Sequence, residues 1–127
     1  MKTKELLVNA LCGYMPHRVM VELKNDKDPY ELLGFHCNDK NIATIGLKFG
    51  DMYATQKVHL DEIKPYLRPI ESMTKKEERE YSKFAHFGNT LGDWTKSIDY
   101  LKSHHIDYRG LIPMDLALPA PDGMYND

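Results

Sequence analysis

The feature that most constrains the fold of this chain is a change in pattern at residues 65–69, Pro-Tyr-Leu-Arg-Pro. Before this segment, apolar and polar residues alternate in short runs that turn-forming residues separate, as in antiparallel strands. After it, two stretches have apolar residues at helical spacing, and an apolar, proline-rich segment follows. Strands that are followed by helices predict an α+β fold.

The first half of the chain holds four runs with the alternation of half-buried strands. They span residues 17–23, 30–37, 42–49 and 52–60. The residues expected to face the core are Val19, Val21, Leu23, Leu33, Phe35, Cys37, Ala43, Ile45, Leu47, Phe49, Ala54, Val58 and Leu60. Gly34 and Gly46 indicate bends or bulges. These runs predict a small curled antiparallel sheet, and an SH3-like barrel is one such architecture.

A short N-terminal helix is predicted from Thr3 to Cys12, because apolar residues recur there at helical spacing and Gly13 follows as a stop signal. At the other end of the sheet, residues 60–64 are expected to form one helical turn that Pro65 ends. The strand-rich half therefore covers residues 1–69.

Two C-terminal helices are predicted within residues 70–109. Thr74 and Glu77 have the spacing of a capping box, in which each side chain binds the other residue's backbone amide. This predicts a helix from Lys75 to about Phe87. The second helix is predicted from the helical spacing of its apolar residues, and we expect it to pack against the sheet. These residues are Trp94, Ile98 and Leu101.

Residues 110–127 are predicted to form an extended, proline-rich tail. Its stretch from Leu111 to Pro121 is nearly uncharged, and exposure of so much apolar surface would be costly. We expect this stretch to pack back on its own domain, and docking on a partner protein is the alternative.

Length and composition limit the class of protein. A chain of 127 residues is expected to fold as one domain. Its net charge of −2 excludes the broad positive field of a non-specific nucleic-acid binder. The N-terminal residues have no secretory or membrane-spanning pattern, and Cys12 and Cys37 form no CxxC pair. We therefore expect a protein of the bacterial cytoplasm that does not contact a membrane.

No catalytic, cofactor-binding or metal-binding residue is predicted. The six histidines form no HExxH motif, and the neighbours His104 and His105 diverge on a helix. His36 and Cys37 are neighbours on a strand, so their side chains face opposite ways. A small metal-dependent hydrolase is therefore only the second alternative function.

Two binding functions remain. The first is protein binding through a face built by Tyr66, Arg68, Tyr108 and Arg109, because Tyr and Arg commonly anchor protein interfaces. The alternative is a weak nucleic-acid module. Its candidate residues are Lys64, Arg68, Lys75, Lys76 and Arg79, although glutamates are interleaved with them.

Three segments also carry a resemblance. They are residues 63–69 with 72–74, residues 107–114, and residues 120–125. In these segments the chain resembles small uncharacterised proteins of phages, prophages and mobile elements of gut bacteroidetes, more closely from Ile63 onward than before it. That group has no established activity. The resemblance therefore implies a genomic setting and an accessory, host-modulating role, and it assigns no catalytic residues.

Overall fold

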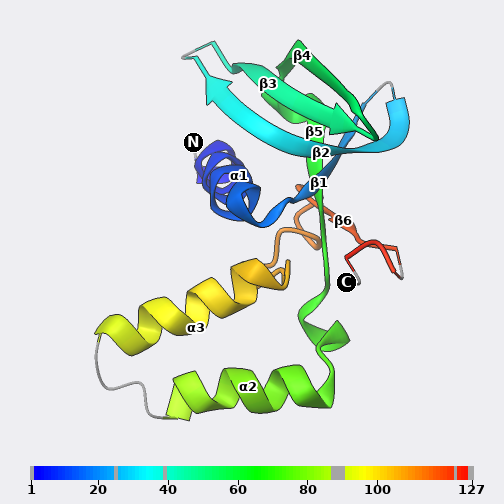
Figure 1. The fold of residues 1–127 in the computed structure, drawn as a ribbon. Coiled ribbons are helices and arrows are strands. Elements are labelled where there is room, and N and C mark those ends of the chain that lie inside the picture. Colours follow the sequence, from blue (N-terminus) through cyan, green and yellow to red (C-terminus); the bar gives the residue numbers. More distant parts are fainter. Residues whose placement is uncertain (1, 25, 39, 87–90, 122, 126–127) are drawn as a thin grey trace.

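The computed structural model describes residues 2–24, 26–38, 40–86, 91–121 and 123–125, and the side chains of residues 2–4, 26, 27, 84–86 and 91–94 lie outside that description. The elements, in chain order, are α1 (Lys2–Tyr14), η1 (Met15–His17), β1 (Met20–Leu23), β2 (Asp26–Cys37), β3 (Ile42–Phe49), β4 (Met52–His59), η2 (Leu60–Glu62), β5 (Ile63–Leu67), η3 (Ile70–Ser72), α2 (Lys75–His86), α3 (Leu91–Ser103) and β6 (Leu118–Pro119). Figure 1 shows α1 beside the sheet, and α2 and α3 paired at the opposite end of the molecule. The predicted α+β class is confirmed.

The strands form one six-stranded sheet with the order β4-β3-β2-β1-β5-β6. Neighbours from β4 to β5 are antiparallel as predicted, whereas β6 is parallel to β5. The sheet is therefore mixed, because the C-terminal segment returns to its edge. It is not closed, since β4 and β6 lie at opposite ends of the strand order, and the described strands do not meet edge to edge as a barrel.

The core lies between α1 and one face of the sheet. Leu7, Ala10, Leu11 and Tyr14 recur at helical spacing and form the buried side of α1. They belong to one cluster with Val19, which precedes β1, and with buried residues of the strands, which are Val21, Leu23, Leu32, Ala43, Ile45, Leu47, Ile63 and Leu67. Helix α1 continues through Gly13, where the prediction ended it, and the Tyr14 hydroxyl donates a hydrogen bond to the carbonyl of Ile106.

A β-bulge in β2 changes which residues face the core. The pairing of β2 with β3 shifts between Leu32 and Gly34. Leu32 is consequently 1% exposed, while Leu33, which the alternation placed inside, is 43% exposed. An extra residue reverses the alternation of a strand, so the prediction for Leu33 is wrong although the bulge near Gly34 was expected. Phe35 and Cys37, beyond the bulge, pack against the core as predicted.

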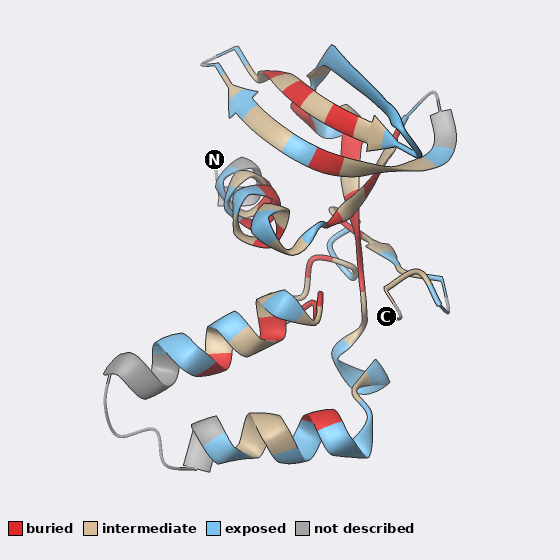
Figure 2. Cartoon of the chain, in the orientation of Figure 1, coloured by how far each residue is buried: buried red, intermediate tan, exposed pale blue. Residues whose placement is uncertain are grey.

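Two other predicted core positions are exposed. Phe49 lies at the end of β3, and Ala54 lies in β4, where most residues are exposed (Figure 2). Both positions lie toward the hairpin that carries β4, which is the edge strand. Only Val58, near the other end of β4, packs against the core as predicted.

Pro65 lies in a strand, which the sequence prediction missed. The predicted helical turn is only Leu60–Glu62, and β5 begins at Ile63. Strand β1 pairs with residues 63–65, and β6 pairs with residues 66 and 67. Because the ladder passes from one neighbour to the other at Pro65, the missing amide of proline is tolerated inside the sheet.

The helical half agrees with the prediction at its start. The Thr74 amide donates to Glu77 Oε1 at 2.9 Å and the Glu77 amide donates to Thr74 Oγ1 at 3.1 Å, which confirms the capping box of α2. The predicted end of this helix at Phe87 lies outside the described residues. Helix α3 packs mainly against α2 and touches α1, so its predicted packing on the sheet is wrong. The helical spacing predicted a buried stripe but not its partner.

The C-terminal segment packs on its own domain, as expected. Leu111 is 1% exposed and Ala117 is 2% exposed, and both belong to the core cluster, whereas Met114 is 43% exposed. The segment is not extended throughout. The Asp107 carboxylate accepts hydrogen bonds from the amides of Leu111 and Ile112 at 2.7 and 2.9 Å and holds a turn.

Candidate functional site

Tyr66 of the predicted protein-binding face is buried inside the domain. Its hydroxyl donates to Glu22 Oε2 at 2.9 Å, and its carbonyl accepts a hydrogen bond from the hydroxyl of Tyr125 at 2.6 Å. Burial and the bond to Glu22 raise the pKa of Tyr66 to about 12. The same Tyr125 hydroxyl accepts the Met20 amide at 2.8 Å. Tyr66 therefore joins β1, β5 and the C-terminal segment.

Arg68 of the same face is bound within the domain as well. Its Nη1 and Nη2 atoms donate to Glu77 Oε2 and Oε1 at 2.8 and 2.7 Å, and Nη2 also donates to the Ser72 carbonyl at 3.0 Å. His104 Nδ1 lies 2.9 Å from Glu77 Oε2. The hydrogen bonds from Arg68 lower the pKa of Glu77 to about 2. These contacts link Arg68, which follows β5, to Glu77 in α2 and to His104, which follows α3.

Backbone hydrogen bonds bring the segment with Tyr66 and Arg68 next to the segment with Tyr108 and Arg109. The Arg68 amide donates to the His105 carbonyl at 2.7 Å, and the Asp107 amide donates to the Arg68 carbonyl at 2.8 Å. Tyr108 is half-buried, with its ring centroid 6.3 Å from that of Tyr14. Arg109 is exposed and lies over the Tyr108 ring, 5.5 Å from its centroid. Of the four residues of this face, Arg109 alone is exposed.

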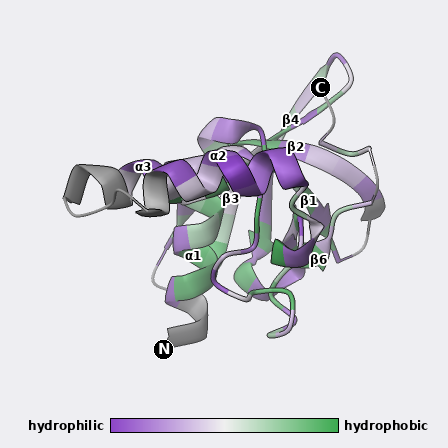
Figure 3. Ribbon diagram, turned by 90° about the horizontal axis from the view of Figure 1, so that it is seen from below, coloured by the Kyte–Doolittle hydropathy of each residue, from purple (hydrophilic) through white to green (hydrophobic). Residues whose placement is uncertain are grey.

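Of the residues proposed for nucleic-acid binding, some form ion pairs within the domain and the others are exposed on α2. Lys64 Nζ lies 2.9 Å from Asp115 Oδ1, and Arg68 is bound to Glu77. Lys75, Lys76 and Arg79 are exposed on α2, where acidic residues lie among them. Figure 3 shows α2 as a mostly hydrophilic helix. The arrangement is that of a solvated helix face with mixed charge.

The neighbouring histidines diverge, but they do not lie on a helix as the sequence predicted, because α3 ends at Ser103 and His105 has φ 60°. His104 contacts Glu77, whereas His105 Nε2 lies 2.6 Å from the His17 carbonyl and its ring stacks on Tyr125 at 3.7 Å. Burial lowers the pKa of His105. Within the described part of the chain, no three side chains of His, Cys, Asp or Glu lie together as metal ligands.

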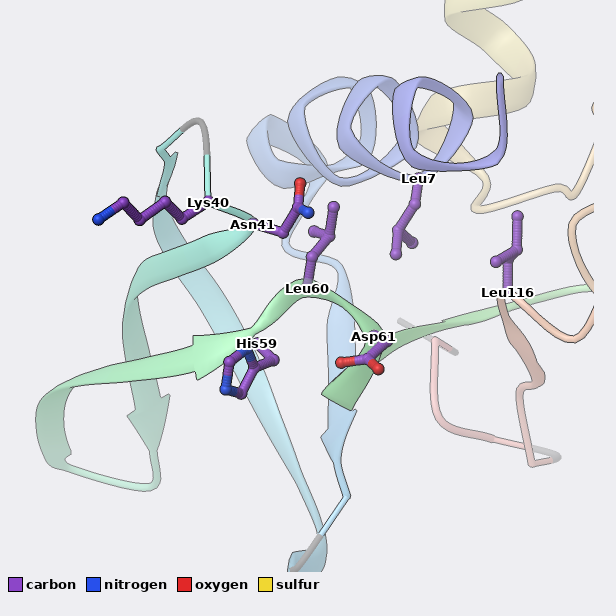
Figure 4. A pocket seen from close by; sticks show the side chains of 7 residues that line it. All are labelled: Leu7, Lys40, Asn41, His59, Leu60, Asp61 and Leu116. Atoms are coloured by element: carbon purple, nitrogen blue, oxygen red, sulfur yellow. The ribbon is translucent and has the colours of Figure 1, made fainter. Parts of the chain in front are cut away.

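Two hollows are lined in part by groups that form hydrogen bonds within the domain. A cavity of about 340 Å³ lies under α1, with Leu7, Leu60 and Leu116 as its apolar walls (Figure 4). At its mouth, the carbonyl of Asn41 accepts the Leu60 amide at 2.9 Å. Another hollow, of about 600 Å³, lies between the start of α2 and the C-terminal segment, and the paired Arg68 and Glu77 line it.

The outer edge of β4 differs from these sites, because its backbone groups have no neighbouring strand. Among the described strands, β4 pairs only with β3. It holds no proline, and Lys57 is its only Lys, Arg, Asp or Glu residue. Natural proteins usually protect an edge with prolines, several charges or a covering segment. None of these devices covers β4 in the described structure.

The turn before β4 determines which backbone groups point outward. Gly50 has φ 60° and is the first central residue of a two-residue hairpin, whose closing pair is Phe49 and Met52. The Leu60 amide donates to the Asn41 carbonyl at 2.9 Å, so the opposed pair Ile42 and His59 does not exchange hydrogen bonds.

Because successive strand residues alternate, this pairing determines whether the backbone amide and carbonyl of each β4 residue point toward β3 or outward. Ala54, Gln56 and Val58 direct their amide and carbonyl groups toward β3, whereas Tyr53, Thr55 and Lys57 direct theirs outward. At the end of the strand, the amide of His59 donates to Glu62 Oε1 at 3.0 Å. We define the outer edge of β4 as the outward backbone groups of Tyr53, Thr55 and Lys57.

Large apolar side chains flank this edge. Met52 is 74% exposed and Tyr53 is 69% exposed, and Phe49 is also exposed. Sequence reasoning missed this site, because alternation predicts that a strand exists but not that it lies at the edge of the sheet. The one available signal was the polar character of residues 55–57, which weakened the apolar face of the run.

None of the helices in the described residues is long and apolar enough to cross a membrane. Neither a family model, nor a curated protein, nor a solved structure matches this chain.

Proposed function

We propose that this chain is a non-enzymatic protein-binding domain that receives an extended segment of its partner on the outer edge of β4. The outward backbone groups of Tyr53, Thr55 and Lys57, which pair with no other strand of the described residues, carry this proposal. An added strand would satisfy these groups with main-chain hydrogen bonds, as in other complexes formed by strand addition. The edge replaces a face on Tyr66 and Arg68, whose side chains are bound within the domain.

The side chains around the edge define the chemistry of the partner. Phe49, Met52 and Tyr53 offer exposed apolar surface at one end of β4. Lys57 and Lys48 add positive charge, and Lys48 Nζ lies 5.8 Å from the centroid of the Tyr53 ring. A matching segment has apolar or aromatic residues in alternation with polar ones, and it contains no proline at the paired positions.

The resemblance of residues 63–69 and 107–114 to proteins of phages and mobile elements supports an accessory role for this binding. The partner is then a protein of the bacterial host, and the function is to alter its activity or placement. Binding by the main chain suits this role, because it tolerates changes in the partner's sequence.

A selection of short peptides from a random library on the immobilised protein tests the function. We expect the selected peptides to be extended and apolar, and to lose at least about tenfold in affinity for Thr55→Pro, which removes an outward amide. Thr55→Ala keeps that amide and is the matched control, with affinity within about twofold of the parent. Equal affinity for Thr55→Pro and the parent would contradict binding at this edge.

Stability measurements separate loss of binding from loss of folding. Thr55→Pro should cost little stability, since proline is tolerated at an edge where its nitrogen faces solvent. Gln56→Pro removes an amide that faces β3, and we expect it to lower the free energy of unfolding by about 3 kcal/mol. Urea unfolding of both variants measures this difference. Equal destabilisation by the two prolines would show that the backbone assignment is wrong.

A further inference from the structure

We propose that a second copy of this chain occupies the outer edge of β4, so that two β4 strands pair antiparallel around a twofold axis at Thr55. This inference rests on the proposed function, because it uses the same open edge. It adds the identity of one partner. The two sheets would then form one continuous sheet across the dimer.

The backbone permits such pairing without changing the fold. A twofold axis at Thr55 places outward residues opposite outward residues, namely Thr55 opposite Thr55 of the second copy and Tyr53 opposite Lys57 of the second copy. These are the pairs that exchange both hydrogen bonds in an antiparallel ladder. Every outward group of the defined edge therefore finds a partner.

The side chains are also complementary in this register. Tyr53 meets Lys57 of the second copy, and within the domain Lys48 Nζ already lies 5.8 Å from the centroid of the Tyr53 ring. Met52 meets Val58 of the second copy, and Ala54 meets Gln56 of the second copy. Threonine pairs and apolar pairs are favourable in antiparallel ladders, and opposite charges are preferred to like charges.

Competing registers are less favourable. An axis at Lys57 would place two lysines directly opposite each other, and like charges at that position are destabilising. An axis at Thr55 also gives the longest overlap near the middle of β4, from Met52 to Val58. No like charges oppose each other in that overlap. The sequence of β4 is therefore nearly self-complementary around one residue.

A cysteine placed on the axis tests the register. In a background with Cys12→Ser and Cys37→Ser, we expect Thr55→Cys to form a covalent dimer under mild oxidation. Opposed residues that exchange hydrogen bonds have Cα atoms about 5.5 Å apart, which is within the range of a disulfide. Ala54→Cys and Gln56→Cys are matched controls, because each would be about 7 to 8 Å from its symmetry mate. Cross-linking of a control in place of Thr55→Cys would overturn the register.

Sedimentation equilibrium tests the association itself. An interface made by one strand pair is small, so we expect a dissociation constant on the order of 10⁻⁵ M for the parent and a monomer for Thr55→Pro. Equal association of the two would place the dimer elsewhere. A parent that stays monomeric at about 10⁻⁴ M while selected peptides still bind β4 would overturn the dimer and leave the proposed function intact. If neither copies nor peptides bind, both proposals fail.

Discussion

Replacing Glu77 with alanine is expected to lower the free energy of unfolding by about 3 kcal/mol, because the change leaves Arg68 without its carboxylate partner. Glu77 is buried, and its carboxylate accepts hydrogen bonds from both terminal nitrogens of Arg68 and from the amide of Thr74. It also contacts His104. Its removal therefore takes away the side-chain contacts that join Arg68 and His104 to α2. Urea unfolding near neutral pH measures the effect.

The adjacent Glu78 is the matched control. It is exposed on the same helical turn, and its replacement by alanine is expected to change stability by at most about 0.5 kcal/mol. If the variants at Glu77 and Glu78 lose equal stability, the ion pair with Arg68 contributes nothing beyond a surface charge.

The contribution of Glu77 should also depend on pH. The Arg68 guanidinium lowers the pKa of Glu77 to about 2 in the folded protein, from the usual value of 4.5. A depressed pKa stabilises the fold fully above the unfolded value, and this stabilisation is lost as the pH falls through the folded value. The difference in unfolding free energy between the parent and Glu77→Gln should therefore shrink as the pH falls from 4.5 to about 2. A constant difference would show that the charge of Glu77 is unimportant.

Truncation of Leu111 to alanine is expected to lower the free energy of unfolding by about 2 to 5 kcal/mol. Leu111 comes from the C-terminal segment, yet it is 1% exposed and lies in the core cluster. The loss combines the transfer of apolar atoms with the cavity that they leave. Thermal unfolding together with urea unfolding measures it.

Met114 lies three residues further along the same segment and is 43% exposed. Met114→Ala is expected to cost at most about 0.5 kcal/mol, which makes it the control for a general effect of shortening side chains in this segment. Similar losses at both positions would mean that the segment does not belong to the core.

Local patterns in the sequence predicted much of the fold. The helical spacing of Leu7, Ala10 and Leu11 identified the buried side of α1, and the capping box at Thr74 and Glu77 identified the start of α2. These features depend on residues a few positions apart. The burial of Leu111 was also expected, because exposure of its apolar segment would be costly.

Features that depend on distant pairing were missed. Leu33 points outward because a bulge reverses the alternation, and Pro65 lies in a strand because the ladder changes neighbours there. Nothing within either run of sequence specifies the strand beside it. From the sequence, Arg68 was likewise interpreted as a residue available to bind a partner protein. In the structure it binds Glu77, which lies in the next helix.

The candidate site could not be predicted for the same reason. The outward direction of the amides of Tyr53, Thr55 and Lys57 follows from the pairing of β4 with β3 and from the absence of another described strand beside β4. Periodicity alone predicts faces of a sheet and not its edges. The sequence therefore predicted a binding role and placed it on other residues.

Residue-resolved hydrogen exchange along β4 tests the central claim most directly, first with dilute protein and then with a selected peptide bound. In the dilute protein, we predict slow exchange at Ala54, Gln56 and Val58 and fast exchange at Tyr53, Thr55 and Lys57. When the peptide binds, the fast amides should become protected, while the slow ones change little. Uniform protection along β4 in the dilute protein, or no added protection at Thr55 on binding, would contradict the account.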